Sequence, residues 1–216
     1  MVELTNDEQI MIRKEFESLK DPIRVRVDLP AEKSDFTADL KALLELVSKS
    51  DERIALEFTE VKEEESEDDL PRMLPRIAIV DAAGSDRGIY FYGTPMAGAL
   101  QSLVQTIAMF SAGDHRLPPE IVERAKALGE TKLEVLITPN APGCSQAINI
   151  ANALAFATGT ITAHTIELIE FPQVAERYNV LGVPKTVANR SLKFTGSYTL
   201  DEVLQILEKK ISDVED

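Results

Sequence analysis

The chain has 216 residues, of which 44% are hydrophobic and 28% charged, with a formal net charge of −14, two histidines and one cysteine. This composition is typical of a globular protein, and the length suffices for one large domain or two small ones. One cysteine excludes an intramolecular disulfide and a multi-cysteine zinc site, and the negative charge argues against binding nucleic acid or an anionic membrane.

The amino terminus is charged and has no apolar signal core, and no stretch approaches the roughly 20 apolar residues that cross a bilayer. We therefore expect a cytoplasmic protein that contacts no membrane. Neither the cysteine count nor the histidine count suggests a metal site, and we expect no cofactor.

The first half of the chain alternates helix and strand signals. Thr5 and Glu8 form a capping box ahead of an opening helix. The alternation of "IRVRVDL" is that of a half-buried strand, and the helix after it has apolar residues at helical spacing. A later acidic run is interpreted as a solvated loop kept open by its own charge. In chain order we predict a helix over 6–19, a strand over 23–29, a helix whose apolar face contains Leu40, Leu43, Leu44 and Val47, a strand over 53–61, the acidic loop over 60–69, a strand after Pro75, a strand over 87–94 and a helix over 95–110.

The second half repeats this plan. The segment "RSLKFTGS" has an arginine, an aliphatic residue, a phenylalanine, a glycine and a hydroxyl residue at the same spacing as "RGIYFYGT" in the first half. Such internal similarity indicates a duplicated structural unit. In chain order we predict a helix over 117–129, a strand over 133–138, a helix whose apolar face contains Ile148, Ala151, Leu154 and Ala155, a strand over 160–169, a short helix, a strand after Pro184, a strand over 190–197 and a final helix over 200–211.

This order predicts the fold class. A strand–helix–strand segment needs a parallel crossover, whereas two strands joined by a tight turn are antiparallel. Each half is therefore an α/β unit with a mixed central sheet flanked by helices. We expect one unit over residues 1–116 and the other over residues 117–216.

A turn and a helix after the first strand, with a proline before the third, resemble the thioredoxin fold. Two such units in tandem are similar to the protein disulfide oxidoreductases, which are glutaredoxin-like proteins. The resemblance covers nearly the whole chain and is most specific in the second half. There "TPNAPGC" stands at the CxxC of the family, and "ERYNVLGVPKTV" stands at the stretch leading to its cis-proline. The chain is also similar to the amino-terminal domain of the alkyl hydroperoxide reductase flavoprotein subunit, whose first unit lacks cysteines.

The resemblance implies a disabled redox site in the second half. In the family, a thiolate at the start of a helix attacks a substrate disulfide, and a second thiol one turn later resolves the mixed disulfide. Carried over by position, Ala141 occupies the attacking site and Cys144 the resolving site, with Pro142 and Gly143 between them. A methyl group is no nucleophile, so we expect dithiol exchange to be lost, either naturally or through deliberate replacement of a cysteine.

The first half has no cysteine at the equivalent turn. Counting from the helix puts the two motif positions at Ser34 and Thr37, whereas counting from the strand puts them at Lys33 and Phe36. The acidic segment that follows is a poor copy of "FPQVAERYNVLG". The second helix of this half is therefore expected to be short or missing.

The resemblance also implies a peptide-binding backbone beside a cis-proline. In the family, the residue before that proline pairs with an extended peptide, and here the two residues are Val183 and Pro184, with Leu74 and Pro75 as counterparts in the first half. The alternative is that both prolines simply begin edge strands.

Three functions remain open. The first is a disulfide oxidoreductase relative that has lost dithiol exchange and keeps a groove for thiol- or disulfide-bearing proteins and peptides. The second is an enzyme that works through Cys144 alone, although a lone cysteine is more often a small buried hydrophobe. The third is a docking module for a peroxiredoxin or a thioredoxin-reductase-type flavoprotein. Whether the chain is an enzyme is therefore left open.

Overall fold

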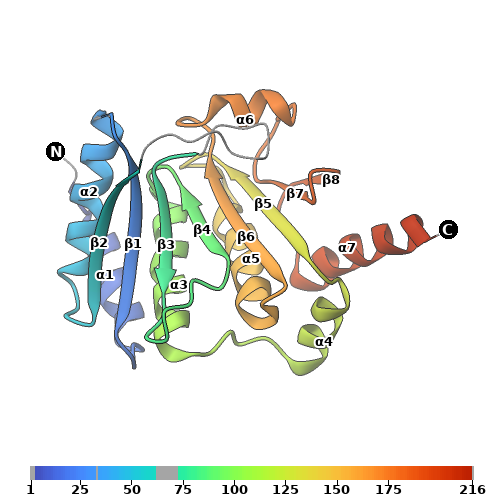
Figure 1. The fold of residues 1–216 in the computed structure, drawn as a ribbon, viewed down its shortest axis with the longest axis horizontal. Coiled ribbons are helices and arrows are strands. Elements are labelled where there is room, and N and C mark those ends of the chain that lie inside the picture. Colours follow the sequence, from blue (N-terminus) through green and yellow to red (C-terminus); the bar gives the residue numbers. More distant parts are fainter. Residues whose placement is uncertain (1–2, 33, 62–72, 216) are drawn as a thin grey trace. The chain divides into compact units, whose positions relative to one another are not determined.

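The computed structural model describes residues 3–32, 34–61 and 73–215 (Figure 1). The chain divides into two compact units, one made of Met1–Asp86 and Tyr90–Gly113 and the other of Arg87–Ile89 and Asp114–Asp216. Most of the predicted acidic loop, and the predicted short or missing helix after it, lie outside the described residues. Within the described ranges, no helix combines the length and apolar character needed to cross a membrane.

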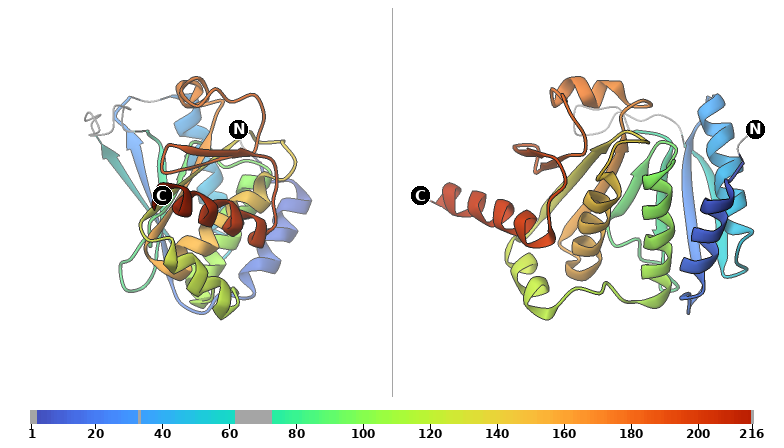
Figure 2. Two further views of the ribbon diagram at one scale, coloured as in Figure 1. Left: turned by 90° about the vertical axis from the view of Figure 1, so that its right-hand side faces the viewer. Right: turned by 180° about the vertical axis from the view of Figure 1, so that it is seen from behind.

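Unit 1 contains a four-stranded mixed sheet. Its strand order is β2-β1-β3-β4, in which β1 runs parallel to β2 and antiparallel to β3, and β3 runs antiparallel to β4. Alternate residues of β1 are buried, because the first helices of the unit pack on one face of the sheet (Figure 2). The elements are α1 (Asn6–Phe16), β1 (Ile23–Pro30), α2 (Asp35–Ser48), β2 (Ile54–Val61), β3 (Arg76–Val80), β4 (Ile89–Tyr92) and α3 (Gly98–Ala112).

Unit 2 repeats this arrangement. Its strand order is β6-β5-β7-β8, with β5 parallel to β6 and antiparallel to β7, and β7 antiparallel to β8. Helix α5 lies across one face of β5 and β6, as the view from behind shows (Figure 2). The elements are α4 (Pro119–Ala127), β5 (Thr131–Ile137), α5 (Cys144–Thr158), β6 (Ile161–Glu167), α6 (Pro172–Arg177), β7 (Lys185–Ala188), β8 (Leu192–Thr195) and α7 (Leu200–Glu215).

The capping signals act as the sequence predicts. Thr5 and Glu8 form a reciprocal capping box at the start of α1, and the amide N–H of Thr199 donates to the carboxylate of Glu202 over 2.7 Å at the start of α7. Helix α1 is shorter than predicted and ends at Phe16 instead of residue 19. The hydrogen bond from the Leu19 N–H reaches back only three residues, to the Phe16 carbonyl at 3.2 Å, which closes a tight turn rather than another turn of α-helix.

The two units correspond residue by residue around the turn after the first strand. Asp28 pairs with Arg76, and Leu136 pairs with Lys185, and both partners directly follow the two prolines. Phe36 stands the same number of residues after Asp28 as Cys144 stands after Leu136. The buried positions Leu40, Leu43, Leu44 and Val47 of α2 correspond in spacing to Ile148, Ala151, Asn152 and Ala155 of α5. The structure therefore favours the count from the strand, which aligns Phe36 with Cys144.

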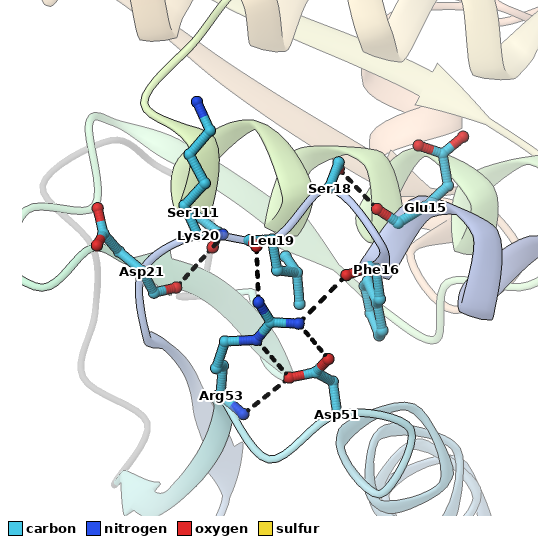
Figure 3. A network of polar contacts seen from close by, with 9 residues as sticks. All are labelled: Glu15, Phe16, Ser18, Leu19, Lys20, Asp21, Asp51, Arg53 and Ser111. Atoms are coloured by element: carbon cyan, nitrogen blue, oxygen red, sulfur yellow. Dashed lines mark hydrogen bonds and ion pairs between the residues drawn. The ribbon is translucent and has the colours of Figure 1, made fainter.

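A polar network holds the end of α1 in unit 1 (Figure 3). The Arg53 guanidinium donates to both carboxylate oxygens of Asp51, at 2.8 Å and 2.6 Å. It also donates to the main-chain oxygen of Leu19 over 2.6 Å and of Phe16 over 3.4 Å. The hydrogen bond from Arg53 lowers the pKa of Asp51. One arginine thus satisfies carbonyls that the end of a helix leaves without an intrahelical partner.

Ser111, at the end of α3, completes this network and supplies a test of it (Figure 3). Its fully buried hydroxyl accepts from the Lys20 N–H at 2.9 Å and donates to the Asp21 carbonyl at 2.5 Å. We expect Ser111→Ala to lower the free energy of unfolding by about 1.5 kcal/mol, because two backbone groups lose their partner. Ser48→Ala, at an exposed helical hydroxyl, is the control and should change it by less than about 0.5 kcal/mol. Equal losses in urea denaturation would show that the network contributes nothing.

Candidate functional site

The candidate site lies where β5 ends and α5 begins. The Ala141 N–H donates to the Thr138 carbonyl over 3.3 Å, which closes the turn, and the Gly143 carbonyl accepts from the Ala147 N–H at 3.2 Å, which opens the helix. Gly143 has a φ of 80°, in the left-handed region that favours glycine. The helix therefore begins only at Cys144. The prediction that residue 141 lies at the helix start is wrong, since the half-buried Ala141 belongs to the turn before it.

Cys144 is the first residue of α5, and its side chain is only 2% exposed. Burial raises the pKa of its thiol, and a hydrogen bond with the Thr138 backbone opposes that rise. The resolving position, expected one turn after the helix start, is thus the first residue of the helix, and it has the burial that is typical of a lone cysteine. A buried thiol with a raised pKa carries little thiolate at neutral pH and is a poor nucleophile.

At Gly143, the turn between β5 and α5 packs closely against Pro184 and the β8–α7 loop. A Cβ atom built on Gly143 would lie 2.8 Å from the Ser197 Cβ and 3.9 Å from the Pro184 Cδ. No side chain fits at the first of these distances without movement of the β8–α7 loop. The turn, the proline ring and the loop thus lie side by side in unit 2.

Two hydrogen bonds from Gln146 fasten the start of α5 to the β8–α7 loop. Its side-chain oxygen accepts from the Ser197 hydroxyl at 2.7 Å, and its side-chain nitrogen donates to the Tyr198 carbonyl at 2.9 Å. Sequence reasoning did not identify Gln146. In the sequence, Ser197 stands out only because a glycine followed by a hydroxyl residue recurs at this position in both halves of the chain. Nothing in the local sequence indicates that Gln146 is its partner.

Val183 is the second expected element of the site. It is half-buried, its bond to Pro184 is cis, and the Leu74–Pro75 bond is cis as well. Across the described ranges, no hydrogen bond is formed by the N–H or C=O of Val183. The next carbonyl, that of Pro184, accepts from the Gly196 N–H at 2.8 Å. Val183 therefore offers an unused backbone donor and acceptor next to the turn that contains Pro142 and Gly143.

Among its described residues, the equivalent turn of unit 1 carries no comparable chemistry. Ser34 is the N-cap of α2 and forms a reciprocal capping box with Thr37, so both hydroxyls act in helix capping. Phe36, at the position that corresponds to Cys144, is 52% exposed. The Pro75 carbonyl accepts from the Gly93 N–H at 3.1 Å, which repeats the contact of Pro184. Throughout the described part of the chain, no three His, Cys, Asp or Glu side chains are grouped to hold a metal ion.

The burial of Cys144 predicts slow alkylation. Because the raised pKa leaves the thiol protonated at pH 8, we expect iodoacetamide to react at least about tenfold more slowly with the folded protein than with the protein in urea. In the folded protein, the reaction rate should still be rising with pH above the ordinary thiol pKa of about 8.5. Rapid alkylation of the folded protein with a midpoint below pH 8 would contradict this and would favour a reactive monothiol.

Comparison with known proteins identifies the same architecture. Residues 131–208 match the family model described as a thioredoxin domain. The chain is 23% identical over 175 residues to an NADH dehydrogenase of Bacillus subtilis and 25% identical over 190 residues to an alkyl hydroperoxide reductase protein, AhpF, of Staphylococcus aureus. Each alignment covers 81% of this chain but only 32% and 37% of the two relatives, so the chain spans about a third of their length.

Solved structures agree with the fold. The NTD_N/C domain of alkyl hydroperoxide reductase AhpF from Enterococcus faecalis superposes with a TM-score of 0.85 at 21% identity, covering 95% of this chain and all 100% of that one. A protein disulfide oxidoreductase from Aeropyrum pernix gives 0.81 at 22% identity, covering 96% and 94%. The chain thus has the thioredoxin-fold architecture of these two proteins, as its sequence predicts, and the match to the thioredoxin domain model over residues 131–208 agrees with this fold.

Proposed function

We propose that this chain is a thioredoxin-fold module that binds thiol- or disulfide-bearing proteins or peptides and has lost dithiol exchange. The observation that carries the proposal is Ala141, a methyl group at the position of the attacking thiol, in a turn that lies against Pro184 and Ser197. Gly143 still packs against Pro184 and Ser197. Val183 still has a free backbone donor and acceptor for an extended peptide.

The chemistry explains why one cysteine is not enough. In dithiol exchange, a thiolate attacks one sulfur of the substrate disulfide, that S–S bond breaks and a mixed disulfide forms. A second thiolate then attacks the mixed disulfide and releases the reduced substrate, which leaves the two protein sulfurs oxidised. Cys144 alone has no second protein thiol to complete the cycle. Its burial and raised pKa also oppose the first attack, which disfavours the monothiol alternative.

A docking module is the second candidate. It is favoured by the curated relatives, one of which is named as part of an alkyl hydroperoxide reductase and another as an NADH dehydrogenase. In this alternative the chain holds a peroxiredoxin or a thioredoxin-reductase-type flavoprotein without reacting with it. We further propose that it works in the cytoplasm, where thiols are kept reduced.

The peptide groove is tested by NMR titration of the labelled protein with a short extended peptide containing one cysteine. We expect the amide signals of Gly143, Val183 and Ser197 to shift together. The control is the same peptide methylated at its central amide nitrogen, which cannot form the strand-like hydrogen bond and should shift them far less. Equal shifts with both peptides, or shifts confined to other residues, would overturn the groove. Binding of an intact peroxiredoxin without any peptide binding would favour the docking alternative instead.

A further inference from the structure

The side of the unit 2 sheet opposite α5 carries several charged residues among buried apolar ones. In Figure 1, β5 and β6 lie in front of α5, which covers one face of these strands. On the opposite face a row of side chains crosses three strands, since Glu134 pairs with Val187 and Val187 pairs with Lys193. Helix α6, at one end of the unit, contributes Tyr178 to this face, just after its last turn.

A buried tyrosine and a buried carboxylate form the centre of this face. The Tyr178 hydroxyl donates to Glu134 Oε2 over 2.5 Å, and the two residues are 4% and 3% exposed. Burial raises the pKa of Tyr178, and Glu134 raises it further. The phenol therefore remains a hydrogen-bond donor at every physiological pH. Lys132 Nζ lies 3.3 Å from the other oxygen of Glu134.

Further cations surround Tyr178. Lys193 Nζ lies 5.3 Å from the centre of its ring and the Arg177 guanidinium 5.7 Å. Lys185 Nζ donates to the Tyr178 carbonyl at 3.0 Å. The charge of Arg190 acts to lower the pKa of Tyr178. We call the resulting surface the basic patch, which consists of Lys132, Arg177, Lys185, Arg190 and Lys193.

Part of the basic patch has no carboxylate partner among the described residues, although Lys132 is paired with Glu134. For the described residues, no carboxylate lies at ion-pair distance from Arg177, Lys185 or Lys193. Arg177 and Lys193 are exposed, and Lys185 is half-exposed. The chain as a whole has 37 acidic and 23 basic residues. A concentration of cations around one tyrosine is therefore a local exception in a protein whose average surface is acidic.

We propose that the basic patch of unit 2 docks an acidic segment of a partner protein. Charge complementarity carries this assignment. Arg177, Lys185 and Lys193 have no carboxylate partner among the described residues, so they attract a local run of Asp and Glu and steer its approach. A long polyanion such as nucleic acid would meet the net charge of −14 beyond the patch and be repelled. The exposed side chains of Arg177 and Lys193 are accessible to such a segment. This proposal does not depend on redox chemistry at residue 141.

The test is fluorescence anisotropy of a labelled glutamate-rich peptide with the full chain at low and high salt. We expect binding that weakens as salt rises. The double variant Arg177→Glu and Lys193→Glu should weaken it at least about tenfold at low salt. The matched control, Lys14→Glu with Lys49→Glu, changes the net charge by the same amount on α1 and at the end of α2 in unit 1, and should weaken binding less than about twofold.

Three results would overturn the proposal. Equal losses in the two double variants would mean that only net charge matters. Absence of salt-dependent binding would mean that the patch is merely solvated. Tighter binding of single-stranded DNA than of a peptide of equal charge would assign the patch to nucleic acid instead. If the glutamate pair fails to fold by circular dichroism, the neutral pair Arg177→Gln and Lys193→Gln is used, with an expected loss of about threefold or more.

Discussion

Replacing Ala141 by cysteine is expected to give a protein that reduces insulin with dithiothreitol at least about tenfold faster than the parent chain, which corresponds to about 1.4 kcal/mol of activation free energy. The new thiol would lie in the turn directly before α5, three positions ahead of Cys144. There the unpaired N–H groups at the helix start favour the thiolate form. The measured quantity is the rate of insulin precipitation above the rate with dithiothreitol alone.

Two controls accompany the Ala141→Cys variant. Ala141→Ser has nearly the same size but no sulfur, and should stay at the background rate. Ala141→Cys combined with Cys144→Ser has the attacking thiol alone, and should form a mixed disulfide with the substrate but turn over slowly. If Ala141→Cys stays at background although its circular dichroism matches the parent, then this scaffold does not position residues 141 and 144 for dithiol exchange.

Gly143→Ala is expected to lower the free energy of unfolding by about 3 kcal/mol. The new Cβ would sit 2.8 Å from the Ser197 Cβ, a distance that packed atoms do not tolerate. The left-handed φ of 80° adds a backbone cost for any residue with a side chain. Urea denaturation followed by circular dichroism measures the loss.

A second glycine separates the two contributions. Gly159, after the end of α5, has a similar φ of 69° but no atom within 4 Å of a built Cβ. Gly159→Ala should therefore lose only about 1 kcal/mol, the cost of the backbone conformation alone. Adding Ser197→Gly to Gly143→Ala removes the close contact and should recover part of the difference. Equal losses at the two glycines would show that the turn does not press against the β8–α7 loop.

The order of elements is predictable from the sequence because its signals are local. Alternation along "IRVRVDL" specifies a strand whatever surrounds it. The capping boxes at Thr5 and Thr199 need only four consecutive residues, and both are formed. The repeated spacing in the two halves then predicts that the second unit copies the first. Together these signals account for the helices and strands, and for their approximate ends.

The start of α5 is not predictable in the same way. The motif predicts a helix at residue 141, but Gly143 adopts the left-handed conformation and delays the helix to Cys144. Ser197, from a distant part of the chain, lies where a side chain at residue 143 would have to go, so the need for glycine there depends on a tertiary contact. The role of Gln146 is not predictable for the same reason, because its partners Ser197 and Tyr198 lie far along the chain, in the β8–α7 loop.

The basic patch could not be predicted from the sequence, because it depends on the register in which the strands pair. Glu134, Val187 and Lys193 share a row only because β5, β7 and β8 pair in one particular register. Tyr178 reaches that row from the end of α6. The basic patch therefore arises from residues that are scattered in the sequence and are brought together by the sheet.

The most direct test of the central claim is a thiol count on the Ala141→Cys protein after oxidation with glutathione disulfide. The oxidised protein is denatured, labelled with iodoacetamide and weighed by mass spectrometry, with a non-reducing gel to exclude dimers. If the site turn is intact and lacks only its first sulfur, residues 141 and 144 form an internal disulfide and the protein takes no label. Two labels, with the parent chain taking one, would show that the two positions do not form a redox pair.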